Sequence, residues 1–263
     1  MSRVMCYKCF WPQPMCWCPT LVPMATRTRF VLLMSPKEFK HEKGNTGRLT
    51  HLCLPNSKLY MGENFDLNEE VQALIHDPEN FPMLLYPGVT ARNLSNGDLT
   101  TADLGGRRLV VFLIDATWGG ARKLLRLSTS LQRLPRIMFT PSAPSRYVIK
   151  QQPQEGCLST LEAVHELLVA LERSGLDRYP LPEQLHGVFQ RMQDLQLKCA
   201  ADLSRPGYRR RAYRPPEDRA AQQAIKVKRR RMKFLKVVPV GAAIGGPAVS
   251  ADAPTTGGGP ARD

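Results

Sequence analysis

The sequence lacks any hydrophobic run long enough to cross a membrane. Its longest apolar stretches, residues 81–86 and 109–114, fall far short of the roughly 20 residues that a spanning helix needs. Both stretches are instead typical of buried strands. The amino-terminal segment is interrupted by Lys8, Pro12 and Pro14 and has no continuous apolar region, so a secretory signal is not expected. We therefore expect no membrane contact, a cytoplasmic location and reduced cysteines.

Acidic residues are scarce in one part of the chain. The sequence of 263 residues carries 37 Lys and Arg against 23 Asp and Glu, and its formal net charge is +14. Residues 1–204 hold 23 basic and 19 acidic side chains, whereas residues 205–236 hold 13 basic and two acidic ones. Tyr208, Tyr213 and Phe234 lie among these cations. Such a mixture suits phosphate neutralisation and base stacking, so RNA is the favoured partner, with a merely solubilising basic surface as the alternative.

Composition divides the chain into four parts. Residues 1–24 are rich in cysteine, and residues 25–204 have the hydrophobic content of one folded domain. Residues 205–236 form the basic extension, to which we assign RNA binding. Residues 237–263 consist mainly of Gly, Ala, Pro and small polar residues. Because such a segment cannot bury a core, this tail is expected to be disordered.

Alternating strands and helices predict an α/β fold. Strands are expected where apolar or β-branched residues run without helical spacing, at residues 29–34, 49–54, 58–61, 81–86, 108–114 and 136–140. Helices are expected where apolar residues recur at intervals of three and four, at residues 69–75, 121–127, 159–174 and 183–203. Ser159 or Thr160 is suited to cap the third helix, and Gly175 to end it. The order of elements predicts a mostly parallel sheet flanked by helices, with ligands at the carboxyl ends of the strands.

Four of the seven cysteines lie near the amino terminus, with the spacing Cys-x2-Cys-x6-Cys-x-Cys. They are Cys6, Cys9, Cys16 and Cys18. Four thiolates can surround one Zn²⁺ at about 2.3 Å, so this segment is predicted to form a structural zinc knuckle. A redox function, or no ligand at all, is the alternative. Phe10, Trp11 and Trp17 are expected to pack over the knuckle, while the remaining cysteines are typical of ordinary buried thiols.

Asp115 directly follows the most hydrophobic predicted strand and precedes a predicted helix. A carboxylate at the end of a parallel strand lies at the edge where such sheets bind ligands. Capping of the following helix by Asp115 or Thr117 is the ordinary explanation for residues of these types at this point. The complete segment Asp-Ala-Thr-Trp at residues 115–118 shifts the balance toward a functional site.

Asp-x-Thr-Trp at residues 115–118, followed by Ala-Arg-Lys at 121–123, resembles the signature of the DTW-domain family of tRNA-uridine aminocarboxypropyltransferases. Other segments resemble further blocks of this family and occur in its order. They are Pro-Lys-Glu at 36–38, Asn-Thr-Gly-Arg-Leu at 45–49, Leu-Tyr-Pro-Gly at 85–88, Leu-Ser-Thr-Leu-Glu-Ala at 158–163 and the amino-terminal cysteine pairs. One departure is Ser35, where many relatives have His, so no function of that imidazole is carried over.

The resemblance implies a reaction and a fold. The reaction is transfer of the 3-amino-3-carboxypropyl group from S-adenosylmethionine to N3 of a uridine in tRNA, with release of methylthioadenosine. The fold is related to the SPOUT superfamily, whose sheet contains a trefoil knot that binds the cofactor, although knots are otherwise very rare. The same chemistry on ribosomal RNA is a second enzyme hypothesis. A noncatalytic zinc-containing RNA-binding protein is the alternative outside catalysis, and the oligomeric state is left open.

The resemblance also implies site residues. Asp115 is the candidate general base or orienting group for the uridine imide, and Thr117 belongs to the same catalytic segment. Trp118 offers a wall for adenine or an extruded uracil, with core packing as its alternative. Candidate residues for binding S-adenosylmethionine are Asn45, Thr46, Gly47, Arg48, Tyr86, Pro87, Gly88, Ser159, Thr160 and Glu162. Arg48 can pair with the cofactor carboxylate, and helix capping explains the last three residues equally well.

Overall fold

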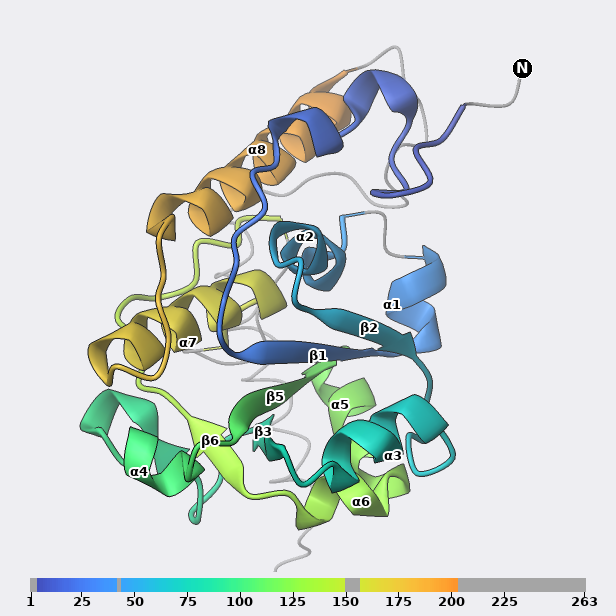
Figure 1. The fold of residues 1–263 in the computed structure, drawn as a ribbon. Helices are drawn as coiled ribbons and strands as arrows, with labels where there is room; N and C mark the ends of the chain where they lie inside the picture. The colour runs from blue at the N-terminus through green and yellow to red at the C-terminus, as the bar shows by residue number, and fades with distance from the viewer. Residues whose placement is uncertain (1–3, 42–43, 150–156, 203–263) are drawn as a thin grey trace, which may run out of the picture. The chain divides into compact units, whose positions relative to one another are not determined.

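The structure is a computed structural model and describes residues 4–41, 44–149 and 157–202. These residues form a six-stranded sheet in which every pairing is parallel (Figure 1). In spatial order the strands are β2 (Lys58–Met61), β1 (Arg29–Met34), β5 (Arg108–Asp115), β3 (Asn80–Leu85), β6 (Arg136–Met138) and β4 (Arg92–Asn93). The predicted fold class is thereby confirmed. Because all strands are parallel, their carboxyl ends lie along one edge of the sheet, and Asp115 ends β5 at that edge.

Helices cover both faces of the sheet. The α-helices of the described part are α1 (Pro36–His41), α2 (Thr46–Cys53), α3 (Glu69–His76), α4 (Thr101–Leu104), α5 (Trp118–Leu127), α6 (Thr129–Arg133), α7 (Thr160–Arg173) and α8 (Pro182–Ala201). Helices α2, α7 and α8 lie on one face, and α3, α5 and α6 lie on the other (Figure 1). A cluster of buried apolar side chains fills the space between the sheet and each helical layer.

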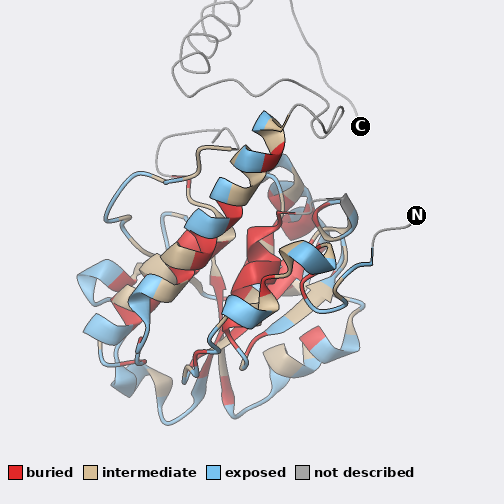
Figure 2. Cartoon of the chain, turned by 90° about the horizontal axis from the view of Figure 1, so that it is seen from above, coloured by how far each residue is buried: buried red, intermediate tan, exposed pale blue. Residues whose placement is uncertain are grey.

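Successive side chains of the central strands pack into the hydrophobic clusters on opposite faces of the sheet. Phe30 and Leu32 of β1 are buried in the cluster that includes α7, while Val31 and Leu33 are buried in the cluster that includes α5. This alternation follows from the two-residue period of a strand. Strands buried on both faces have continuous apolar sequences, which explains the strong strand pattern of β1 and β5. Figure 2 shows buried residues gathered toward the centre and exposed residues on the outer sides of helices.

The strand expected at residues 49–54 is wrong, because most of these residues belong to helix α2. The side chain of Asn45 caps this helix by accepting a hydrogen bond from the backbone N–H of Arg48 at 2.7 Å. Six of the eight residues of α2 are buried, so the helix lacks the polar face by which an amphipathic helix is recognised. A short apolar run that is buried on most sides cannot be distinguished from a strand by its periodicity.

The remaining predicted strands and helices are present, with small shifts in their bounds. Helix α7 begins with a capping box: the Ser159 hydroxyl accepts from the N–H of Glu162 at 3.3 Å, and the Glu162 carboxylate accepts from the N–H of Ser159 at 2.9 Å. Gly175 follows the helix with a left-handed φ of 71°, as its predicted function as a stop requires. Helices α1, α4 and α6 were not predicted, because each is too short to show a helical period.

Parts of the predicted organisation lie outside the described residues. They are the basic extension at 205–236 and the tail at 237–263, so the assignment of these segments stays a prediction. The trefoil knot that the SPOUT resemblance implies also stays a prediction. Within the three described ranges, no helix combines the length and apolar character that crossing a bilayer requires.

Asp177 holds the entry of β1 against the end of α7, and a substitution there should destabilise the fold. Its carboxylate is 3% exposed and accepts hydrogen bonds from the N–H groups of Arg27, Thr28 and Arg178 at 2.7 to 2.8 Å. We expect Asp177→Asn to lower the free energy of unfolding by about 2 kcal/mol. The amide NH₂ group is a donor, and it would replace one of the two carboxylate oxygens that accept from backbone N–H groups. Urea denaturation measures this change. The exposed control Asp194→Asn should stay within about 0.5 kcal/mol, and equal losses would contradict the assignment.

Candidate functional site

Asp115 links segments that are distant in the sequence. Its Oδ2 accepts a hydrogen bond from Asn45 Nδ2 at 2.9 Å, and its Oδ1 accepts one from Thr160 Oγ1 at 2.7 Å. Asn45 caps α2, and Thr160 is the first residue of α7. The Asp115 residue is only 6% exposed. Both helices therefore begin at one buried carboxylate, and the positive ends of their dipoles favour its negative charge.

The backbone of α2 approaches Asp115 so closely that a side chain at residue 47 would not fit. A Cβ atom on Gly47 would lie 2.3 Å from Oδ2 and 2.7 Å from Cγ of Asp115. Both distances are well below van der Waals contact. The Asn-Thr-Gly segment thus has a physical basis: Asn45 supplies a donor to the carboxylate, Thr46 is buried in the first helical turn, and Gly47 leaves the space that the carboxylate occupies.

The capping explanation applies to Thr117 and not to Asp115. The Thr117 hydroxyl accepts a hydrogen bond from the N–H of Gly120 at 3.2 Å and caps helix α5. Since α5 already has its cap, the position of Asp115 needs another explanation. A catalytic function of Thr117 stays a prediction. The side chain of Trp118 lies outside the described part of the chain, so its stacking function also stays a prediction.

Arg48 holds a positive charge beside this acid. Its guanidinium carbon lies 4.0 Å from the centre of the Phe10 ring and 4.6 Å from that of Phe39, and Nη2 donates to the Phe39 carbonyl at 3.1 Å. Burial lowers the pKa of Arg48, while the negative charge of Asp115 opposes that shift. An arginine side chain stays protonated in proteins, so the arrangement holds a fixed cation that can bind a carboxylate.

The α7 candidates divide between the site and the loop after β6. Thr160 reaches Asp115, whereas Glu162 does not point to the same acid. The Glu162 carboxylate is 3% exposed and accepts hydrogen bonds from the Ser145 hydroxyl at 2.8 Å and the N–H of Arg146 at 2.7 Å. Ser159 and Glu162 therefore shape the start of α7 and fasten the loop that precedes it.

Tyr86, Pro87 and Gly88 leave β3 at the carboxyl edge of the sheet and contact β6. The N–H of Tyr86 donates to the Ile137 carbonyl at 3.1 Å, and the Arg136 guanidinium lies 5.3 Å from the centre of the Tyr86 ring. A Cβ atom on Gly88 would lie 3.1 Å from Arg136 Nη1. These residues are placed to form a wall at the β6 side of the edge, while α2 and α7 contact Asp115 directly.

The four amino-terminal cysteines converge as a metal site requires. Their Sγ atoms all lie within 4.8 Å of one another. The Cys6 and Cys18 sulfurs are 3.8 Å apart, and the Cys9 and Cys16 sulfurs are 3.7 Å apart. Sulfurs at about 2.3 Å from a tetrahedral Zn²⁺ are separated by about 3.8 Å, so the cluster fits zinc. The predicted packing of Trp11 and Trp17 is present, since both are 5% exposed and meet edge to face.

The thiols of this cluster differ in acidity. The backbone N–H groups of Cys9 and Lys8 lower the pKa of Cys6 to about 6. Burial raises the pKa of Cys16 and raises that of Cys18 to about 12. Zinc must therefore displace protons from the latter two thiols, and its affinity should fall as the pH falls.

Phe10 joins the cysteine cluster to the Asp115 site. It follows Cys9 with a left-handed φ of 59°, which is uncommon for a residue with a side chain. Its ring lies against the Arg48 guanidinium and is 49% exposed. The sequence predicted Phe10 over the knuckle, but it predicted neither the contact of Phe10 with Arg48 nor that of Phe39 with Arg48. No spacing signal could reveal these contacts, because they join separate elements.

Comparison with known proteins finds a match to one family model. The family is described as the DTW domain, and the match covers residues 3–197. The chain is 32% identical over 191 residues to tRNA-uridine aminocarboxypropyltransferase 2 of Drosophila melanogaster, which covers 70% of this chain and 73% of the fly protein. It is 30% identical over 206 residues to the protein of that name in Mus musculus, covering 76% of this chain and 66% of the mouse protein. No solved structure matches.

Gly47→Ala tests the close approach of α2 to Asp115. Because the added methyl group would overlap the carboxylate, we expect a loss of roughly 1 to 3 kcal/mol in the free energy of unfolding, or displacement of α2. Thermal denaturation of the purified protein measures the effect. The matched control is Gly119→Ala in α5, where a Cβ atom meets nothing within 4 Å; alanine there should be neutral or stabilising by up to about 1 kcal/mol. A Gly47 variant as stable as the control would refute the close approach.

Metal analysis tests the cysteine cluster. The purified full chain should contain about one zinc per chain, and Cys9→Ser should reduce that content to near zero, since a structural zinc site needs its four ligands. Cys157→Ser, a buried thiol outside the cluster, should retain the metal. Fewer than about half an equivalent of zinc in the unsubstituted protein would count against the site.

Proposed function

The chain belongs to the DTW-domain family, and from this membership we propose that it is a tRNA-modifying transferase. The relatives named above are tRNA-uridine aminocarboxypropyltransferases. The finer proposal is that this chain transfers the 3-amino-3-carboxypropyl group of S-adenosylmethionine to N3 of a uridine in tRNA. The observation that carries the proposal is the meeting of α2 and α7 at the buried carboxylate of Asp115, on the edge of the sheet where ligands bind.

The residues around Asp115 fit the amino-acid end of the donor. When bound, S-adenosylmethionine supplies a γ-carbon that its sulfonium group activates toward nucleophiles. The Arg48 guanidinium can hold the donor carboxylate through charge-assisted hydrogen bonds. The first N–H groups of a helix have no acceptor within the helix, so the starts of α2 and α7 offer further partners for an anion.

Positioning decides which carbon reacts, because the same sulfonium activates both the methyl group and the γ-carbon. A residue that fixes the amino-acid end can turn the propyl arm toward the RNA and the methyl group away from it. Arg48 is suited to this function, since Phe10 and Phe39 confine its guanidinium from two sides. Such alignment can contribute several kcal/mol to the lowering of a reaction barrier.

The uridine must lose its N3 proton as the N–C bond forms and the C–S bond breaks. Asp115 can orient the imide or accept that proton. We assign it the orienting function, because hydrogen bonds from Asn45 and Thr160 to its two oxygens fix the direction of the carboxylate. The N3 proton passes to solvent water, the electron pair left on N3 forms the N–C bond, and the electron pair of the broken C–S bond leaves with methylthioadenosine. A fixed, preorganised charge needs no rearrangement when the reaction occurs.

The other sequence predictions complete the proposal. The zinc knuckle supports the site through the contact of Phe10 with Arg48. The indole of Trp118 stacks on adenine or on the extruded uracil. The basic extension at 205–236 neutralises tRNA phosphates, and the reaction takes place in the cytoplasm.

A nucleoside assay tests the function directly. The purified full chain is incubated with S-adenosylmethionine and tRNA, and the digested RNA is analysed by mass spectrometry. We expect a uridine bearing the aminocarboxypropyl group, together with methylthioadenosine. Ribosomal RNA in a parallel reaction separates the two RNA substrates. Product on ribosomal RNA alone would contradict tRNA as the substrate, and no product on either RNA would contradict the transferase.

Substitutions at Asp115 and Thr160 test the site. We expect Asp115→Asn to lower turnover by about 10², the cost of a misplaced reacting group, with donor affinity measured separately by calorimetry. Thr160→Val removes the hydroxyl that holds Asp115 and should also lower turnover, whereas the matched Thr160→Ser keeps it and should retain activity. Undiminished turnover of Asp115→Asn would remove that residue from the mechanism.

A further inference from the structure

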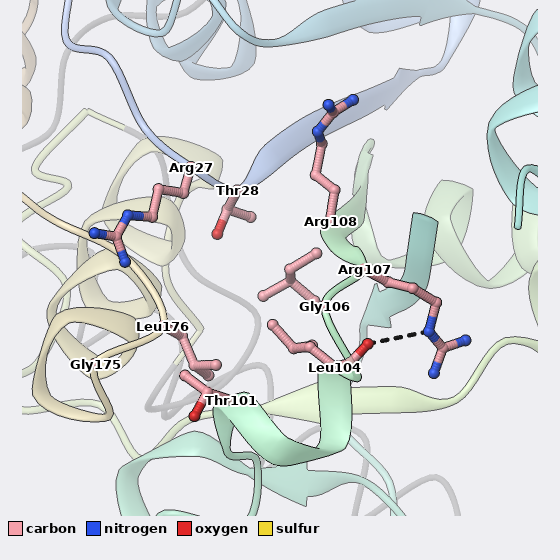
Figure 3. A pocket seen from close by; sticks show the side chains of 10 residues that line it. Arg27, Thr28, Thr101, Leu104, Gly106, Arg107, Arg108, Gly175 and Leu176 are labelled. Atoms are coloured by element: carbon pink, nitrogen blue, oxygen red, sulfur yellow. Dashed lines mark hydrogen bonds between the residues drawn. The ribbon is translucent and has the colours of Figure 1, made fainter. Parts of the chain in front are cut away.

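A cavity of about 370 Å³ lies at the edge of the sheet opposite to Asp115. Its walls come from the segment that enters β1, helix α4, the turn that enters β5 and the residues that follow α7 (Figure 3). Arg108 begins β5 and Asp115 ends it, and at about 3.3 Å per residue these two positions are about 23 Å apart. The cavity is therefore separate from the proposed catalytic site.

The cavity is cationic. Arg27, Arg107 and Arg108 line it, and its lining includes no acidic residue. Figure 3 shows Arg27 on one side and Arg107 with Arg108 on the other. Among the described residues, none of these arginines forms an ion pair, although Arg107 donates to the Leu104 carbonyl at 3.1 Å. Positive charge around a concave surface attracts and concentrates anions.

Nearby carboxylates are already engaged elsewhere. Asp177 accepts the N–H groups of Arg27, Thr28 and Arg178. Asp103 accepts from Thr100 and forms an ion pair with Arg92 at 2.9 Å. Arg107 lies over the Phe81 ring, with its guanidinium carbon 4.6 Å from the ring centre, so Arg27 and Arg108 are the cavity arginines that we expect to bind a ligand.

The rest of the cavity wall is mostly apolar. Leu104, Leu109 and Leu176 line it, and the last two are at most 5% exposed. Thr28 is 1% exposed, and its hydroxyl has no hydrogen-bond partner within the described ranges. An apolar wall, cations at the rim and an unpaired hydroxyl match a nucleotide, which has an apolar base face and an anionic phosphate.

We infer that this cavity binds a nucleotide of the RNA substrate, with its base against the leucines and the neighbouring phosphates of the RNA at the rim, where Arg27 and Arg108 lie. The inference rests on the proposed function and deepens it, because it gives tRNA a second contact about 23 Å from the reacting uridine, by the strand rise given above. Phosphate contacts fix the orientation of a nucleic acid without reading its sequence. The second contact therefore orients the tRNA, while the Asp115 edge holds the base that reacts.

Binding measurements with a charge-matched control test the inference. The double variant Arg27→Gln/Arg108→Gln is compared with Arg126→Gln/Arg133→Gln, which removes two exposed arginines outside the cavity, both in the full chain. For the cavity variant we expect tRNA affinity to fall about tenfold at roughly 0.1 M salt. The slope of log affinity against log salt concentration should also become shallower by about one to two, as expected for lost phosphate contacts. The control should match the unsubstituted protein, and equal melting temperatures establish that both variants are folded.

Free nucleotide is tested separately, by calorimetric titration with adenosine 5′-monophosphate. Loss of this binding in the cavity variant with unchanged tRNA affinity would overturn the assignment to RNA and leave a free nucleotide as the ligand. No difference between cavity and control variants in either titration would overturn the site. The nucleoside assay on the unsubstituted protein tests the transferase independently, so weaker tRNA binding by the cavity variant without any modified uridine would refute the reaction alone.

Discussion

The hydrogen bonds to the Asp115 carboxylate hold together the part of the molecule on which the proposed chemistry depends. The donors are Asn45, which caps α2, and Thr160, which starts α7. A buried carboxylate without such donors would carry a large desolvation cost. Its burial therefore requires both helix starts to stay in place, and the close approach of Gly47 follows from the same constraint. The hydrogen-bonded Asp115 carboxylate thus joins the end of β5 to the starts of α2 and α7.

The cysteine cluster extends this constraint beyond the sheet. Phe10 projects from the knuckle onto the guanidinium of Arg48, which also contacts the Phe39 ring. A cation–π contact contributes about 0.5 to 2 kcal/mol, depending on its exposure, so a metal bound by the cysteines would order the cation beside Asp115 as well as the knuckle. The cysteine cluster and the candidate ligand site are in physical contact through Phe10 and Arg48, although the segments that form them are separate in the sequence.

The two edges of the sheet differ in charge and in what they offer an RNA. The carboxyl edge presents Asp115 among helix starts, whereas the opposite edge presents Arg27 and Arg108 around an apolar cavity. The proposed reaction at the carboxyl edge needs a fixed geometry, which buried hydrogen bonds supply. The opposite edge needs only positive charge and shape, which exposed arginines supply at the surface. A substrate as large as tRNA can contact both edges.

Residues that lie close together in the sequence determined the element types, most strand bounds, the cap of α7 and the four cysteines of the cluster. These features depend on residues a few positions apart, such as the Ser159 to Glu162 capping box. The sequence predicted a strand where helix α2 lies. Because this helix is buried on most sides, its apolar and polar residues do not alternate with the spacing that indicates a helix. Only the tertiary structure decided that Asn45 and Thr160 meet Asp115, that Phe10 covers Arg48, and that Arg27 and Arg108 share a cavity. The physical reason is that these contacts arise where helices and strands pack, and packing brings together residues whose separation along the chain carries no repeating signal.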